Sequence, residues 1–161
     1  MLAASSGVAV AERGSKEVIE LTAAAEIVAT SLISRAEVAA AFARAVRLGV
    51  LDHDGGRRAQ RRFLREWPDL ARVPVSEALV SRAEILAWDY GLRGYDAMQL
   101  ASALTWQESI GEDVFLGTFD GQLWKAAPGV GLKVWPRRSR NRGVRESISA
   151  RASRATALPR V

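Results

Sequence analysis

The chain has 161 residues, no cysteine, one histidine and a formal net charge of +5. This length suits one domain with a single core. The absence of cysteine excludes disulfides and thiolate zinc sites and fits a reducing compartment, so we expect a cytoplasmic protein. No apolar run is long enough to cross a bilayer, and the first ten residues lack a signal-peptide pattern, so no membrane association is expected.

The positive charge is concentrated at the C-terminal end. From Arg137 onward there are eight arginines and one acid, a charge of +7, whereas residues 1–136 carry fifteen basic and seventeen acidic side chains, a charge of −2. Residues 137–161 also show little hydrophobic periodicity. We therefore predict a domain at 1–136 followed by a basic, disordered tail, which either contacts RNA phosphates non-specifically or has no role.

Short apolar segments alternate with segments of helical periodicity along the body. We predict strands or extended pieces at residues 26–30, 73–75, 113–118 and 132–135. We predict helices at residues 34–49, 56–66 and 76–91, from residues 95–96 onward, and at 120–124. Strands that alternate with helices imply an α/β domain with a mostly parallel sheet covered on both faces.

Several residues mark the expected ends of these helices. Ser34 is the predicted N-cap of the first helix, and Gly49 is a suitable glycine just after its end. The second helix should stop before Trp67–Pro68, because a residue that precedes proline disfavours the helical region. Ser76 is expected to begin the third helix, which should close near Gly91.

Three carboxylates, Glu37, Asp96 and Asp120, lie where a strand or turn is followed by a helix. Each has a structural alternative, because Glu37 completes a capping box with Ser34, and the two aspartates could be N-caps. Together the three acids indicate a shared binding cleft, since ligands of an open parallel sheet bind beyond the carboxyl ends of its strands. Converging carboxylates without thiol or imidazole partners suit Mg²⁺ or Mn²⁺, which could activate water for phosphodiester hydrolysis.

Three segments resemble motifs of one known family. Residues 91–104, GLRGYDAMQLASAL, closely resemble the third motif of PIN-domain ribonucleases, in particular the toxins of VapBC-type toxin–antitoxin pairs. Residues 29–38 resemble the second motif of that family, and residues 115–120 resemble its fourth motif. The resemblance covers roughly residues 14–136, with the motifs in the family's order and spacing.

The resemblance implies a three-layer α/β/α PIN fold and a Mg²⁺- or Mn²⁺-dependent endoribonuclease. It also implies inhibition by a cognate antitoxin and, commonly, a homodimer. Glu37, Asp96 and Asp120 match the acidic residues that bind metal and carry out catalysis in the family. Thr118 matches a hydroxyl position beside the last acid, and Arg93, close to Asp96, is a candidate for contacting phosphate.

The chain departs from the family at its first motif, in which the central strand ends in an aspartate followed by serines. If Ser5 and Ser6 match these serines, Ala4 stands in place of the aspartate. If residues 12–15 are the anchor instead, the aspartate would fall at about Met1 or before it. We therefore expect a truncated or degenerate first strand, or a misassigned start. Two alternatives follow: a catalytically impaired PIN domain that binds antitoxin or RNA, and a truncated chain without its central strand.

Other features have two interpretations. Five arginines recur at helical spacing: Arg57, Arg58, Arg61, Arg62 and Arg65. They could contact RNA phosphates or an acidic antitoxin segment, or form a solvated face. His53 is expected in a loop or at a helix start, and the five tryptophans are expected to pack in the core or at its edge.

Overall fold

The computed structural model describes residues 2–4 and 25–135. Five strands form one sheet in the order β3-β2-β1-β4-β5. Their bounds are Leu2–Ala4 (β1), Val28–Ser31 (β2), Ala71–Val73 (β3), Phe115–Gly117 (β4) and Lys133–Trp135 (β5). Every pair of neighbouring strands is parallel. The predicted α/β class with a mostly parallel sheet is confirmed.

Strand β1 takes the centre of the sheet. Leu2 pairs with Val28 of β2 on one side and with Phe115 of β4 on the other, and Ala4, the last residue of β1, pairs with Gly117. The alternative that the chain lacks its central strand is therefore wrong. The predicted tail lies outside the described residues, and the domain boundary at 136 stays a prediction.

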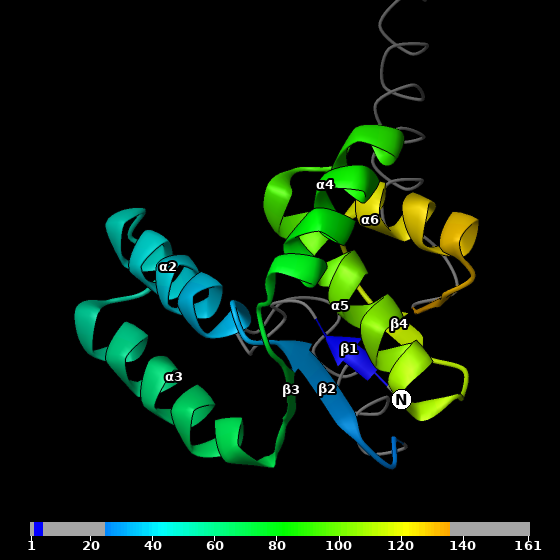
Figure 1. Ribbon diagram of the computed structural model, residues 1–161. Helices are drawn as coiled ribbons and strands as arrows, with labels where there is room; N and C mark the ends of the chain where they lie inside the picture. Colours follow the sequence, from blue (N-terminus) through cyan, green and yellow to red (C-terminus); the bar gives the residue numbers. More distant parts are fainter. Residues whose placement is uncertain (1, 5–24, 136–161) are drawn as a thin grey trace, which may run out of the picture.

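Helices connect the strands and cover the sheet (Figure 1). They are Ser34–Arg47 (α2), His53–Glu66 (α3), Glu77–Tyr90 (α4), Gly94–Ile110 (α5) and Gly121–Ala126 (α6), with 3₁₀ turns at Trp67–Asp69 (η1) and Ala127–Val130 (η2). Helices α4 and α5 pack together over the sheet, whereas α2 and α3 form a hairpin that projects to one side. None of these helices combines the length and apolar character that crossing a membrane requires.

The apolar residues separate into two clusters. The larger one joins α4, α5 and α6 to the sheet, and its fully buried side chains include Leu100, Leu116 and Leu123. The smaller one lies between α2 and α3, where Phe42 and Val38 pack with Phe63 and Trp67. The rings of Phe63 and Trp67 have centroids 5.3 Å apart and are tilted by 56°. The hairpin therefore has an apolar core of its own.

The predicted helix boundaries are mostly confirmed. Gly49, which follows α2, and Gly91, the C-cap of α4, both have positive φ, and Ser76 caps α4 by accepting a hydrogen bond from the amide of Leu79. Helix α3 ends at Glu66 as expected but begins at His53, three residues before the predicted start, because Asp52 caps it through the amide of Gly55. His53 is thus a helix-start residue.

One further prediction is wrong and another fails in part. Ser34 is not the N-cap of α2, since Ile33 takes that position without a side-chain cap. Of the tryptophans, Trp67 is buried as expected, but Trp88 on α4 is 89% exposed. Trp88 therefore contributes little to the core.

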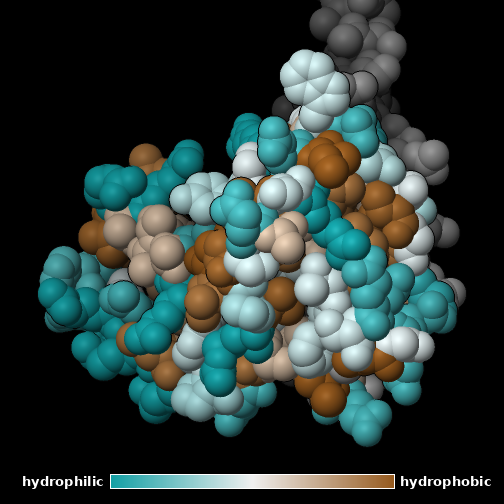
Figure 2. All heavy atoms as spheres, in the orientation of Figure 1, coloured by the Kyte–Doolittle hydropathy of each residue, from teal (hydrophilic) through white to brown (hydrophobic). Residues whose placement is uncertain are grey.

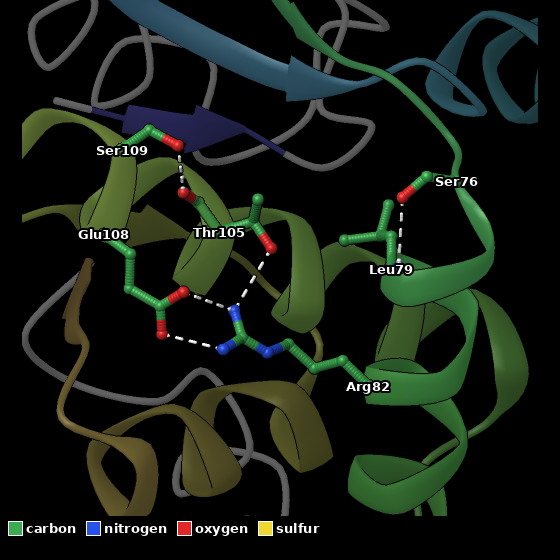
Figure 3. A network of polar contacts seen from close by, with 6 residues as sticks. All are labelled: Ser76, Leu79, Arg82, Thr105, Glu108 and Ser109. Carbon is green, nitrogen blue, oxygen red and sulfur yellow. Dashed lines mark hydrogen bonds and ion pairs between the residues drawn. The ribbon is translucent and has the colours of Figure 1, made fainter.

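A polar contact fastens α4 to α5 on the outside of the domain (Figure 3). The guanidinium of Arg82 donates to both carboxylate oxygens of Glu108 at 2.7 and 2.8 Å and to the hydroxyl of Thr105 at 3.2 Å. This two-point geometry lowers the pKa of Glu108, because the bound arginine favours its charged form.

Replacing Arg82 with methionine should lower the free energy of unfolding at pH 7 by up to about 1 kcal/mol, since the pair is largely exposed. The pKa of Glu108 is depressed in the folded protein, so this stabilisation is present above its unfolded pKa and is lost as pH falls through the folded value. Urea denaturation at pH 7 and at low pH measures both effects. Arg62→Met, which breaks the single exposed contact of Arg62 with Glu66, is the control and should cost less. An equal loss in the two variants would contradict the prediction.

Candidate active site

The three carboxylates of the sequence analysis are all placed near the carboxyl edge of the sheet. Glu37 lies in the first turn of α2, which follows β2, and Asp120 follows β4 as the N-cap of α6. Asp96 lies in the first turn of α5. The strand order reverses direction at β1, between β2 and β4, and such a switch point is where open parallel sheets bind ligands.

Electrostatics shows that the carboxylates share one neighbourhood. The pKa of Glu37 is raised, first by its partial burial and also by the negative charge of Asp96, while a hydrogen bond from Gln99 opposes the rise. The pKa of Asp96 is raised by partial burial and by the charge of Asp120, while Arg93 opposes the rise. Asp96 thus disfavours the ionisation of Glu37, and Asp120 disfavours that of Asp96, a repulsion that a bound cation would relieve.

Glu37 does not form the capping box that its sequence allows. The hydroxyl of Ser34 accepts hydrogen bonds from the hydroxyl of Thr30 at 2.8 Å and from the side-chain amide of Gln99 at 2.9 Å. The same Gln99 nitrogen donates to Oε2 of Glu37 at 2.7 Å. The serine is therefore held by tertiary partners, and the glutamate is held across the interface between α2 and α5.

Asp96 is not an N-cap either. Arg93 takes the cap position of α5 with an extended backbone, and Asp96 is the third residue of the helix. Its half-buried carboxylate receives no hydrogen bond from the residues that the structure describes. A negative charge in the first turn is favoured by the helix dipole, and the exposed Arg93 guanidinium adds to this.

Asp120 is the N-cap that one interpretation predicted. Its Oδ1 atom accepts hydrogen bonds from the amides of Gln122 and Leu123 at 2.8 and 2.9 Å. Thr118 is 3% exposed, and its hydroxyl accepts a hydrogen bond from the amide of Asp120 at 3.1 Å. Capping occupies one oxygen of an exposed carboxylate, so the other oxygen stays available for a ligand.

The donor set fits a hard divalent cation in its chemistry, because it consists of carboxylate oxygens that repel one another. The three acids do not by themselves form a complete metal-binding group. Within the described ranges, no three acidic or histidine side chains converge in this way. Mg²⁺ requires no complete protein cage, because it keeps several waters and commonly binds one or two carboxylates together with substrate phosphates. The acids fit such a partial site.

The role of Gln99 was not predicted from the sequence. Gln99 is 2% exposed and lies among the buried residues of α5, which are otherwise small or apolar. The available signal was a large polar side chain within the apolar run of this helix. Buried amides need hydrogen-bond partners, so such a residue indicates a polar contact within the fold.

Two other polar or concave surfaces lie away from the carboxylates. The five arginines of α3, Arg57, Arg58, Arg61, Arg62 and Arg65, are all exposed, as a solvated face requires. An open groove of about 320 Å³ lies between α2 and α3, lined by apolar side chains such as Phe42 and Val46 together with Arg47 and Arg57. Neither surface contains any of the three acids.

Comparisons with known proteins give one family and several similar solved structures. The model of the PIN domain matches residues 7–127. The fold is similar to a toxin–antitoxin complex from Klebsiella pneumoniae, with a TM-score of 0.54 and 21% identity over 80% of this chain and 87% of that one. It is also similar to FitAcB from Neisseria gonorrhoeae, with a TM-score of 0.58 and 20% identity over 83% and 96% of the two chains. Comparison with the curated proteins finds no sequence match.

Proposed function

Because this chain belongs to the PIN domain family, we propose that it is a metal-dependent endoribonuclease of the toxin type. The observation that carries the proposal is the placement of Glu37, Asp96 and Asp120 at helix starts beside the switch point of the sheet, where, besides partial burial, Asp96 raises the pKa of Glu37 and Asp120 raises the pKa of Asp96. Structural acids are usually paired with a cation or fully hydrogen-bonded, whereas the pKa values of Glu37 and Asp96 are raised by partial burial and by a neighbouring carboxylate, which is typical of functional sites.

In the proposed mechanism these acids hold Mg²⁺ or Mn²⁺ through their oxygens. The bound ion would activate water and stabilise negative charge on the phosphodiester. Asp96, placed between the other two in this electrostatic chain, is the central ligand, and Glu37 is fixed by its bond to Gln99. Arg93 offers an exposed positive charge beside Asp96, where it would attract a backbone phosphate.

The proposed substrate is single-stranded or looped RNA in the cytoplasm. Unstacked loops present their backbone and bases to a small site, whereas a regular duplex buries its bases in the stack. The body of the chain is slightly acidic, so binding would depend on local cations such as Arg93 and the metal rather than on a broad basic surface.

The proposed partner is a cognate antitoxin protein that neutralises the nuclease, and the proposed assembly is a homodimer. One similar structure is a toxin–antitoxin complex, which supports this class of partner. The exposed arginines of α3 could meet an acidic segment of the antitoxin.

A second candidate function is a catalytically impaired PIN domain that binds antitoxin or RNA. It is favoured by the alanine at the end of the central strand, where the family motif has an aspartate, and by the open arrangement of the acids. Under this alternative the chain binds its partner but turns over RNA slowly or not at all.

Incubating the purified chain with structured RNA, in Mg²⁺, Mn²⁺ or a chelator, tests the two candidates. We expect slow cleavage within single-stranded segments that the chelator abolishes, and no cleavage of duplex DNA. Cleavage that persists in the chelator would contradict the metal dependence and would indicate a contaminating nuclease. RNA binding without cleavage in either metal would favour the impaired module.

A further inference from the structure

Gln99 links the helix that carries Asp96 to the helix that carries Glu37. It is carried by α5, three residues after Asp96, and its side chain reaches the first turn of α2, where it contacts Ser34 and Glu37. The two contacts join residues more than sixty positions apart in the chain. No other side-chain hydrogen bond between α2 and α5 occurs among the described residues.

The geometry of Gln99 leaves its amide one orientation. Its nitrogen donates both of its hydrogens, to Ser34 at 2.9 Å and to Glu37 at 2.7 Å, and its oxygen receives no hydrogen bond from the described part of the chain. Turning the amide over would set that oxygen against the Glu37 carboxylate, two acceptors in contact. The amide nitrogen therefore points toward Glu37 for two reasons. It is attracted to the carboxylate, and the flipped amide would be repelled by it.

A second anchor makes the arrangement rigid. Ser34 is itself held by the hydroxyl of Thr30, which belongs to β2, and both side chains are buried. Gln99 therefore connects Glu37 through Ser34 to the sheet. A buried and mutually supporting network of this kind restricts the rotamers of its members.

We propose that Gln99 is a positioning residue that fixes the Glu37 carboxylate for binding a divalent cation. The inference rests on the proposed function, because it assigns Glu37 as a metal ligand. Partners that orient a metal ligand typically change metal affinity by about 10–100-fold when removed. Gln99 would act through Glu37, without contacting the ion or the RNA.

The main test is the affinity for Mn²⁺, measured by calorimetric titration of the full chain. Gln99→Met keeps a side chain of similar length but removes the donor, and it should weaken Mn²⁺ binding about tenfold. The same substitution in a Glu37→Gln background should change the affinity less than twofold, because the ligand that Gln99 orients is already altered. A full tenfold loss in both backgrounds would overturn the proposal in favour of a general structural role.

Ser102→Ala is the matched control. Ser102 is 1% exposed, lies on the same helix, and donates only to the backbone oxygen of Met98. Its removal should leave Mn²⁺ affinity within twofold of the wild type. If it weakens binding as much as Gln99→Met does, the effect comes from disturbing α5 and the proposal is overturned.

Side-chain amide exchange in the metal-free wild type tests the contact without any substitution at Gln99. The Gln99 amide protons should exchange at least about tenfold more slowly than those of the exposed Gln122, and Glu37→Ala should speed their exchange. Equal exchange at the two glutamines would overturn the inference, even if Gln99→Met does not fold. A wild type that binds no Mn²⁺ but shows the protected amide would refute the proposed function and leave the contact intact.

Discussion

Replacing Asp96 with asparagine should abolish metal-dependent RNA cleavage and, in the metal-free protein, raise the melting temperature at neutral pH. Asparagine keeps the shape of the side chain but removes the charge that the proposed cation needs. Altering a residue that only supports a metal ligand lowers metal affinity or activity by about 10–100-fold, so loss of the central ligand should lower the cleavage rate by at least about a hundredfold.

The gain in stability follows from the raised pKa of Asp96. An acid whose pKa is higher in the folded state than in the unfolded state binds more protons when folded. Its contribution to stability is therefore fully present below the unfolded pKa and is lost as pH rises through the folded pKa. At neutral pH the wild type carries this cost of a partly buried charge, and the asparagine variant does not.

Asp113→Asn is the control for both measurements. Asp113 is an exposed acid before the amino end of β4, away from the carboxyl edge, and it pairs with Lys133. Its replacement should leave cleavage unchanged and should lower stability slightly, by no more than about 1 kcal/mol. Unchanged cleavage by a folded Asp96→Asn protein would remove Asp96 from the site.

Introducing aspartate at Ala4 should increase Mg²⁺-dependent cleavage by about tenfold or more. Ala4 ends the central strand β1, which lies between the strands that lead to Glu37 and to Asp120. A carboxylate at that position would give the cation a fourth oxygen-bearing side chain and a more defined geometry. The same change should destabilise the metal-free protein, because it adds a like charge beside acids that already repel one another.

Ala4→Asn separates charge from size in this experiment. It introduces a side chain of nearly the same volume without the negative charge and should leave cleavage at the wild-type level. The prediction fails if the two variants cleave RNA equally well. It also fails if the wild type already cleaves RNA robustly in Mg²⁺, since the three acids would then suffice.

The α/β fold could be predicted from the sequence because it depends on local patterns, and the same patterns predict that the three acids lie at helix starts, as they do. Strand and helix periodicity gave the parallel α/β sheet, and a strand followed by a helix places a polar residue at its carboxyl edge. The detailed roles depend on contacts that no local pattern contains. The tetrapeptide Ser-Arg-Ala-Glu occurs at residues 34–37 and again at 81–84, and its members act differently in the two places.

In the first copy Gln99 holds both the serine and the glutamate, so no capping box forms. In the second copy the serine and glutamate are exposed, and the arginine takes the structural role by binding Glu108. Four identical residues cannot specify which tertiary partner they will meet. The two copies differ in their place in the helix, since the first begins α2 and the second lies inside α4, and each meets a different residue of α5.

The central position of β1 also constrains the order of events during synthesis. This strand precedes its neighbour β4 by most of the domain, and Leu2 must wait for Phe115 before that side of the sheet can pair. Pairings so distant in sequence form late and slowly. A nascent chain on the ribosome therefore has no complete carboxyl edge until β4 has emerged, which would delay the proposed cleavage of nearby RNA until translation of the domain is nearly finished.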